Sequence, residues 1–162
     1  MKYLKSYNES IDREITTSDV ERVLDLELEQ YTEFSIVEYG IDPLNNSEKR
    51  KLEEAGIIPF DQRPHTLFYV NITFSLEDNT ELSTRFDEIQ GNLDCDLKSN
   101  LITTLTNDIG NVIKPILQKL SKKYEFEIES GHDLLLLNNG NSDVKQFFIE
   151  FVMIIKNTEL FK

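Results

Sequence analysis

The chain has 162 residues and a net charge of −13, from 17 Lys and Arg against 30 Asp and Glu. Hydrophobic residues make up 39 % of the chain, enough to bury a core, and 6 Gly and 4 Pro exclude collagen-like and low-complexity classes. The acidity disfavours direct nucleic-acid binding, which needs cations to displace phosphate counterions, and a single cysteine excludes a disulfide framework and a cysteine-rich zinc site.

Residues 1–15 carry charges between apolar residues and lack the apolar run of a secretory signal. The most apolar stretch, 147–155, is too short to cross a bilayer as a helix. We therefore expect a soluble, cytoplasmic protein with no membrane partner. The expected organisation is a single domain, 1–162, in which residues 1–15 form a short amphipathic helix or a docking arm.

The next segment, 20–31, allows two interpretations. Ser18 can cap a helix, and the apolar residues that follow then share one helical face. Alternatively, Leu24, Leu26 and Leu28 alternate with acidic residues, which is the period of a strand. We prefer the helix; its apolar face would hold Val20, Val23, Leu24, Leu28 and Tyr31.

Residues 34–41 are expected to be extended, and Gly40 with Asp42 and Pro43 ends that segment. Ser47 can then cap a short helix that Gly56 terminates.

The clearest pattern lies between His65 and Phe86. Apolar and polar residues alternate over 68–76, which predicts a half-buried strand. A polar turn follows at 77–80, and Leu82, Thr84 and Phe86 resume the alternation. This region is therefore predicted to be a β-hairpin.

A long amphipathic helix is predicted after Asp96 or Ser99, because apolar residues recur at helical spacing as far as Leu120. Gly110 and Pro115 interrupt the pattern. Since proline lacks a backbone donor and clashes with the preceding turn, we expect a kink or a break near Gly110.

The C-terminal third is predicted to be a meander of three strands, at 124–129, 134–137 and 146–156. A helix is the alternative for 146–156, and the last residues, 157–162, are expected to be frayed. The whole pattern predicts an α+β fold: a mostly antiparallel sheet, made of the hairpin and the meander, covered by the long kinked helix, with an N-terminal helical segment.

Chemistry-bearing motifs are scarce. The sequence contains none of the glycine-rich phosphate loops or the GxSxG nucleophile motif. His65 and His132 are far apart in the sequence, and Cys95 lies between Asp94 and Asp96, whose charges disfavour a thiolate. We therefore predict no catalytic residue, no metal ligand and no cofactor.

The first dozen residues resemble the N-termini of small proteins encoded by large tailed bacteriophages. Those proteins often begin with Met–Lys, an aromatic residue or Leu, and a short aromatic–Asn–Glu segment. The resemblance implies a docking or packaging tag, because similar leaders direct proteins into the capsid in some such phages. The matching residues are Met1, Lys2, Leu4, Tyr7, Asn8, Glu9 and Ile11.

Three functions are compatible with these observations. The first is a non-catalytic phage protein that acts through protein–protein contacts as a virion component or assembly factor, in the host cytoplasm or the virion. The second is an acidic inhibitor or host-takeover protein that binds a basic surface, including as a nucleic-acid mimic. The third is a carboxylate-dependent enzyme. The first two would use a protein partner, or a second copy of the chain, at Tyr3, Leu4, Tyr7, Tyr69, Asn71, Thr73, Glu125, Glu127 and Glu129.

Overall fold

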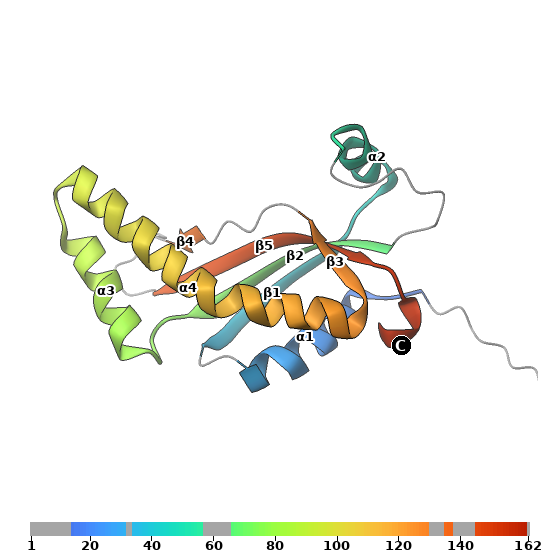
Figure 1. The fold of residues 1–162 in the computed structure, drawn as a ribbon, viewed down its shortest axis with the longest axis horizontal. Helices are drawn as coiled ribbons and strands as arrows, with labels where there is room; N and C mark the ends of the chain where they lie inside the picture. Colours follow the sequence, from blue (N-terminus) through green and yellow to red (C-terminus); the bar gives the residue numbers. More distant parts are fainter. Residues whose placement is uncertain (1–13, 32–33, 57–65, 130–134, 138–144, 162) are drawn as a thin grey trace, which may run out of the picture.

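A computed structural model describes residues 14–31, 34–56, 66–129, 135–137 and 145–161. It has the expected α+β fold, an antiparallel sheet with helices packed against it (Figure 1). The elements in chain order are α1 (Thr17–Tyr31), β1 (Ser35–Pro43), α2 (Asn46–Glu54), β2 (Thr66–Ser75), α3 (Thr80–Gly91), α4 (Cys95–Tyr124), β3 (Phe126–Glu129), β4 (Leu135–Leu137), β5 (Gln146–Ile155) and the 3-10 helix η1 (Thr158–Phe161).

The strand order is β1-β2-β5-β3, and each neighbouring pair is antiparallel. β4 pairs with one end of β5, at Gln146–Phe148, whereas β3 pairs with the other end, at 152–155. The two long central strands, β2 and β5, pair along their whole length. They therefore form the platform on which the helices pack.

The main core lies between this platform and helices α1 and α4. Every second residue of β2 is buried from Phe68 to Phe74, and β5 contributes the matching alternation from Phe147. Phe74 and Phe147 stack with their ring centroids 4.9 Å apart, and the edge of Phe34 contacts both rings. Truncating Phe147 to alanine would remove about 3–5 kcal/mol of stability, because the neighbouring rings cannot fill the space.

The preferred interpretation of 20–31 is confirmed, since this segment is the helix α1. Val20, Leu24 and Leu28 are fully buried, whereas Leu26, which a strand would place beside the other leucines, is 58 % exposed. The expected cap at Ser18 is wrong. Thr16 precedes the helix and exchanges hydrogen bonds with Asp19, so Ser18 lies inside the first turn.

Helix α2 begins two residues earlier than the cap at Ser47 predicts. The Asn45 side chain accepts a hydrogen bond from the backbone of Glu48, and the Glu48 carboxylate accepts one from the backbone N–H of Asn45. This reciprocal pair satisfies two backbone donors at once, which Ser47 could not do from within the helix. Gly56 follows the helix with a positive φ of 70°, as the prediction of a helix end there requires.

The predicted hairpin is wrong, because Leu82, Thr84 and Phe86 belong to helix α3. Asn79 caps this helix by accepting a hydrogen bond from the backbone N–H of Leu82. Phe86 and Ile89 are its buried residues, and their spacing of three positions is helical. The segment is short enough to fit both periods, and packing against α4 and the core favours the helix.

Helix α4 runs without a break from Cys95 to Tyr124, so the alternative of a break near Gly110 is wrong. Its axis bends part-way along the helix (Figure 1). Asp94, and neither Asp96 nor Ser99, is the N-cap. Pro115 leaves the Asn111 carbonyl without its helical donor. Because both residues are exposed, solvent can replace that bond, and the helix continues.

The three predicted C-terminal strands are present, but the meander is wrong, because among the described residues β3 and β4 both pair with β5 and not with each other. Residues 146–155 form a strand, and Phe151 to Ile155 are all buried because this end of β5 is covered on both sides. Tyr124 ends α4, so only 126–129 are extended in the first strand. The tail is not frayed over the described residues, since Phe161 is fully buried against the rings of Tyr124 and Phe126.

Candidate functional site

The sheet has one face that α1 and α4 leave uncovered. Strand alternation turns Tyr69, Asn71 and Thr73 to this face, because their neighbours in β2 point into the main core. Helix α2 covers one end of the face, where Leu52 packs near Leu67, Val152 and Ile154. The remaining part, which we call the open face, is polar.

Antiparallel register aligns the side chains of the open face in rows across the strands. Thr73 lies between Glu38 of β1 and Phe148 of β5. The next row joins Gly40, Asn71 and Glu150, and the third joins Asp42, Tyr69, Val152 and Glu129. Directly paired residues have side chains about 5 Å apart on the same face, so four strands contribute to one surface.

A shallow hollow of about 290 Å³ lies at Gly40, lined by Glu38, Asp42, Tyr69, Asn71 and Thr73. The absence of a side chain at Gly40 creates it: a β-carbon there would lie 3.4 Å from that of Asn71. Asn71 of β2 is therefore accessible between Glu38 and Asp42, the two carboxylates that flank Gly40 on β1. Such a hollow can receive a single cationic side chain.

The floor of the open face is a hydrogen-bonded cluster around Glu150. Asn71 donates from Nδ2 to Glu150 Oε1 at 3.2 Å, and the Tyr69 hydroxyl also hydrogen-bonds to Glu150. Burial and this contact with a carboxylate raise the pKa of Tyr69 to about 12, so the phenol stays a neutral donor. The cluster fixes the side chains of two neighbouring strands.

Negative charge dominates the open face. Lys156 forms an ion pair with Glu127, whose strand lies at the far side of the face from β1. Glu38 and Asp42 are exposed and have no ion-pair partner among the residues that the structure describes. Together with Glu129 and Glu150, they give the surface the sign that attracts a cationic partner.

The structure brings together most of the site residues predicted from the sequence. Tyr69, Asn71 and Thr73 share the open face with Glu127 and Glu129. Glu125 does not join them, because it is the left-handed C-cap of α4, with φ 53° and ψ 52°. The remaining candidates, Tyr3, Leu4 and Tyr7, lie outside the described residues.

Four residues of the open face escaped the sequence analysis: Glu38, Gly40, Asp42 and Glu150. Each alternates with apolar residues in its own strand, which marks it as facing away from the core. Their proximity to Asn71 depends on which strands pair and in which register, and neither can be read from a single strand.

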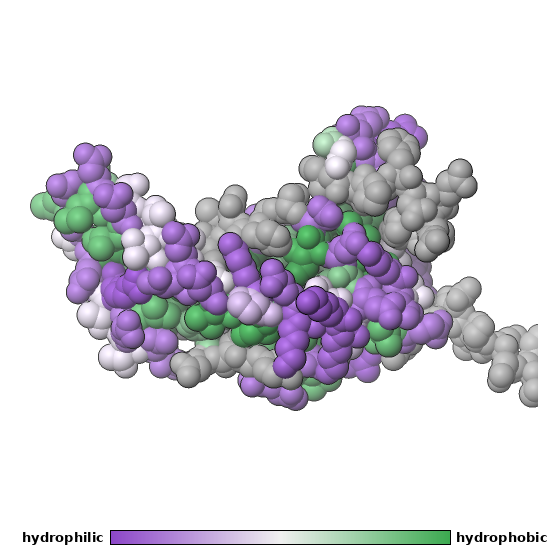
Figure 2. All heavy atoms as spheres, viewed as in Figure 1, coloured by the Kyte–Doolittle hydropathy of each residue, from purple (hydrophilic) through white to green (hydrophobic). Residues whose placement is uncertain are grey.

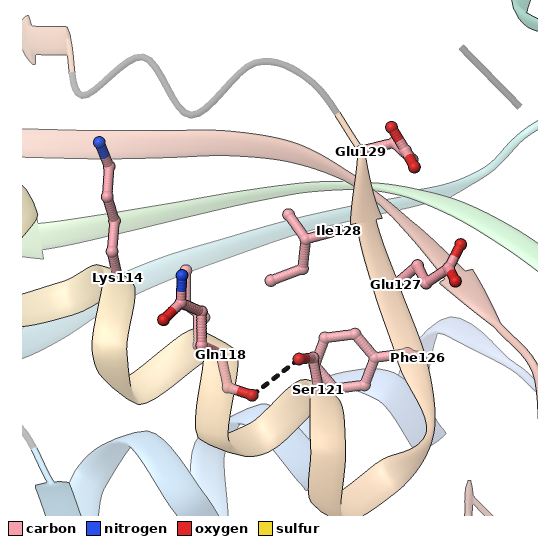
Figure 3. Close-up of a pocket in the computed structure, with 8 residues that line it drawn as sticks. Lys114, Gln118, Ser121, Phe126, Glu127, Ile128 and Glu129 are labelled. Atoms are coloured by element: carbon pink, nitrogen blue, oxygen red, sulfur yellow. Dashed lines mark hydrogen bonds between the residues drawn. The ribbon is translucent and has the colours of Figure 1, made fainter.

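A second hollow, of about 330 Å³, lies between α4 and β3 (Figure 3). Phe126 and Ile128 point from β3 toward α4, whereas Glu127 and Glu129 point away from it. Lys114 and Gln118 stand at the rim. Leu117, Phe126 and Ile128 form the apolar part of its lining, and the other lining residues are polar or charged.

Cys95 is exposed, and none of the described residues form a group of three or more potential metal ligands. His65 and His132 lie outside the described ranges. No helix within those ranges is both long and apolar enough to cross a membrane.

Comparison with known proteins gave no match: no family model, no curated protein and no solved structure is similar to this chain.

Proposed function

We propose that this protein acts by binding another protein, and that the open face of its sheet is the contact surface for a basic region of that partner. The observation that carries the proposal is the hollow at Gly40, where Asn71 lies between the exposed carboxylates of Glu38 and Asp42. A Lys or Arg side chain that enters the hollow has Glu38 on one side and Asp42 on the other, and the charge-assisted hydrogen bond it can form with either is stronger than a neutral one.

The resemblance of residues 1–11 to phage leaders supports a role in a virion or in its assembly. In this proposal the N-terminal segment directs the protein to its site, and the open face makes the contact there. Mass spectrometry of purified particles separates two versions of the role. A virion component is retained through purification, whereas an assembly factor is present in infected cells and absent from particles.

The acidity of the open face favours a second candidate, an inhibitor that covers a basic surface on another protein. Such an inhibitor competes with DNA for a nucleic-acid-binding protein, and its binding weakens steeply as salt is added. A virion or assembly role requires no competition with DNA.

Site-specific photo-cross-linking tests the contact surface. A photoreactive residue at Thr73, in the centre of the open face, should cross-link one defined protein in cells that express this protein naturally. The double charge reversal Glu38→Lys/Asp42→Lys should abolish that product, because it replaces attraction by repulsion.

The matched control is Glu21→Lys/Glu29→Lys, which makes the same change in net charge on exposed positions of α1. It should leave the cross-link intact. If both double variants reduce the product equally, only net charge matters and the open face is not the contact surface.

A further inference from the structure

The other unusual surface is the projecting end of the α3–α4 hairpin. Figure 1 shows α3 and the first turns of α4 side by side, beyond the end of the sheet. Not one residue from Cys95 to Thr104 is buried, although the apolar stripe that is buried from Leu105 onward continues through them as Leu97 and Leu101. Leu101 packs against the edge of the main core, and the stripe continues beyond it to the half-exposed Leu97.

Apolar side chains are concentrated at this tip. Leu93, between the two helices, is 97 % exposed, and Leu97 is 49 % exposed. Leu93 and Leu101 line one open hollow with Glu88 and Asp94. Figure 2 shows a hydrophobic patch at this end of the molecule, bordered by hydrophilic side chains.

Contacts of α3 with α4 and with the body of the protein hold the hairpin in place beyond the sheet. Arg85 of α3 forms an ion pair with Asp108 of α4 at 2.7 Å. Lys145, just before β5, binds Asp87 at 2.7 Å and the Ser83 hydroxyl at 2.8 Å. Phe86 anchors α3 in the main core.

The charge around the tip indicates the charge of the partner that would bind there. Glu88, Asp94 and Asp96 surround the leucines, and Lys98 is the nearby cation, so the border is negative overall. A second copy would bring the same acidic border against itself, which disfavours self-association through the tip. A partner with apolar residues flanked by Lys or Arg fits both the patch and its border.

We propose that the tip of the α3–α4 hairpin binds a basic amphipathic helix of a partner protein, which packs its apolar face on Leu93, Leu97 and Leu101. This helix would complete a three-helix arrangement with α3 and α4, a common mode of helix recognition. The proposal is independent of the open face, since it uses a different surface and a different partner element.

Cys95 provides the measurement, because it is exposed at the tip and is the sole cysteine of the chain. An environment-sensitive dye on Cys95 of the full chain is titrated with a synthetic amphipathic peptide that carries a leucine stripe flanked by lysines. The same peptide with glutamates in place of the lysines is the reference. The dye should report saturable binding of the lysine peptide alone, weakening with added salt.

Variants identify the surface. Leu93→Ser/Leu97→Ser should weaken binding about tenfold or more, because it removes apolar area from the contact. Leu26→Ser, an exposed leucine of α1, is the matched control and should leave the affinity unchanged. Circular dichroism should show the same helix content in all three proteins, since the substituted side chains are largely exposed.

Four results would overturn the proposal: no binding of the lysine peptide, equal binding of the glutamate peptide, equal weakening by Leu26→Ser, or a dye signal that depends on protein concentration without peptide. The last result would show that a second copy covers the tip. The double variant Glu38→Lys/Asp42→Lys separates the two proposals, because it should abolish the cross-link from Thr73 while changing peptide affinity at the tip less than threefold.

Discussion

The two ends of helix α4 carry the same kind of sequence and have different surroundings. Between Leu105 and Leu120 one face of the helix is buried in the main core, whereas no residue from Cys95 to Thr104 is buried and only Leu101 and Ile102 reach the edge of that core. The apolar period determines that both ends are helical. It does not determine which other segments pack on each end. The buried end has a structural role, and the exposed end is a candidate binding segment.

The largest expected effect comes from the covered end. Ile113→Ala should lower the free energy of unfolding by about 2–5 kcal/mol, because it leaves a cavity in a tightly packed core. Ile113 is 1 % exposed, and its neighbour Val112 is 48 % exposed. Urea unfolding of Ile113→Ala and of the control Val112→Ala measures the contrast. Similar losses for both would mean that α4 does not pack as described.

The projecting end should respond locally and more weakly. Asp94 Oδ1 accepts hydrogen bonds from the backbone N–H groups of Asp96 at 3.0 Å and Leu97 at 3.2 Å. Asp94→Ala should therefore destabilise this end by about 1 kcal/mol, as loss of an N-cap does.

Hydrogen exchange reads the effect of Asp94→Ala directly. Amides of the first turns of α4 should lose protection, while those around Ile113 keep theirs, because the projecting end can fray without opening the core. Asp96→Ala, which removes an acid from the same turn without removing the cap, is the control. Equal loss of protection along the whole helix would show that its two ends are not independent.

The smallest expected effect concerns the last turn of the covered end, where Glu27 of α1 bonds to Lys123 and to the Tyr124 hydroxyl. The hydrogen bond to Lys123, followed by that to Tyr124, lowers the pKa of Glu27 below its ordinary value of 4.5. This carboxylate therefore stabilises the fold above that ordinary value, and the contribution is lost as the pH falls through the lower folded-state pKa.

The difference in stability between the natural protein and Glu27→Gln measures this contribution, because most other titrating groups cancel. The difference should be greatest near neutral pH and shrink as the pH falls below 4.5. Glu21→Gln, on an exposed position of α1, is the control and should show no such trend. A difference that grows toward acid pH would contradict the assigned direction of the shift.

Local patterns were sufficient for the elements with a long, consistent period. The alternation over 68–76 and the stripe from Leu105 to Leu120 each allow one structure, because a wrong period would expose many apolar side chains. The segment at Leu82, Thr84 and Phe86 is too short for its period to decide, and the strand prediction there failed.

The tertiary structure decided what no single segment contains. The pairing of β1 with β2 places Glu38 and Asp42 around Asn71, and the pairing of β2 with β5 brings in Glu150. Whether Leu97 is core or surface depends on where the sheet ends. The burial of Phe161 likewise depends on other segments, because its ring packs against Tyr124 and Phe126 and its carbonyl accepts a hydrogen bond from Arg22. The spacing of apolar residues and the local hydrogen bonds determine whether a segment forms a helix or a strand. Strand register, and which other segments bury a given side chain, depend on the free energy of the whole packed chain.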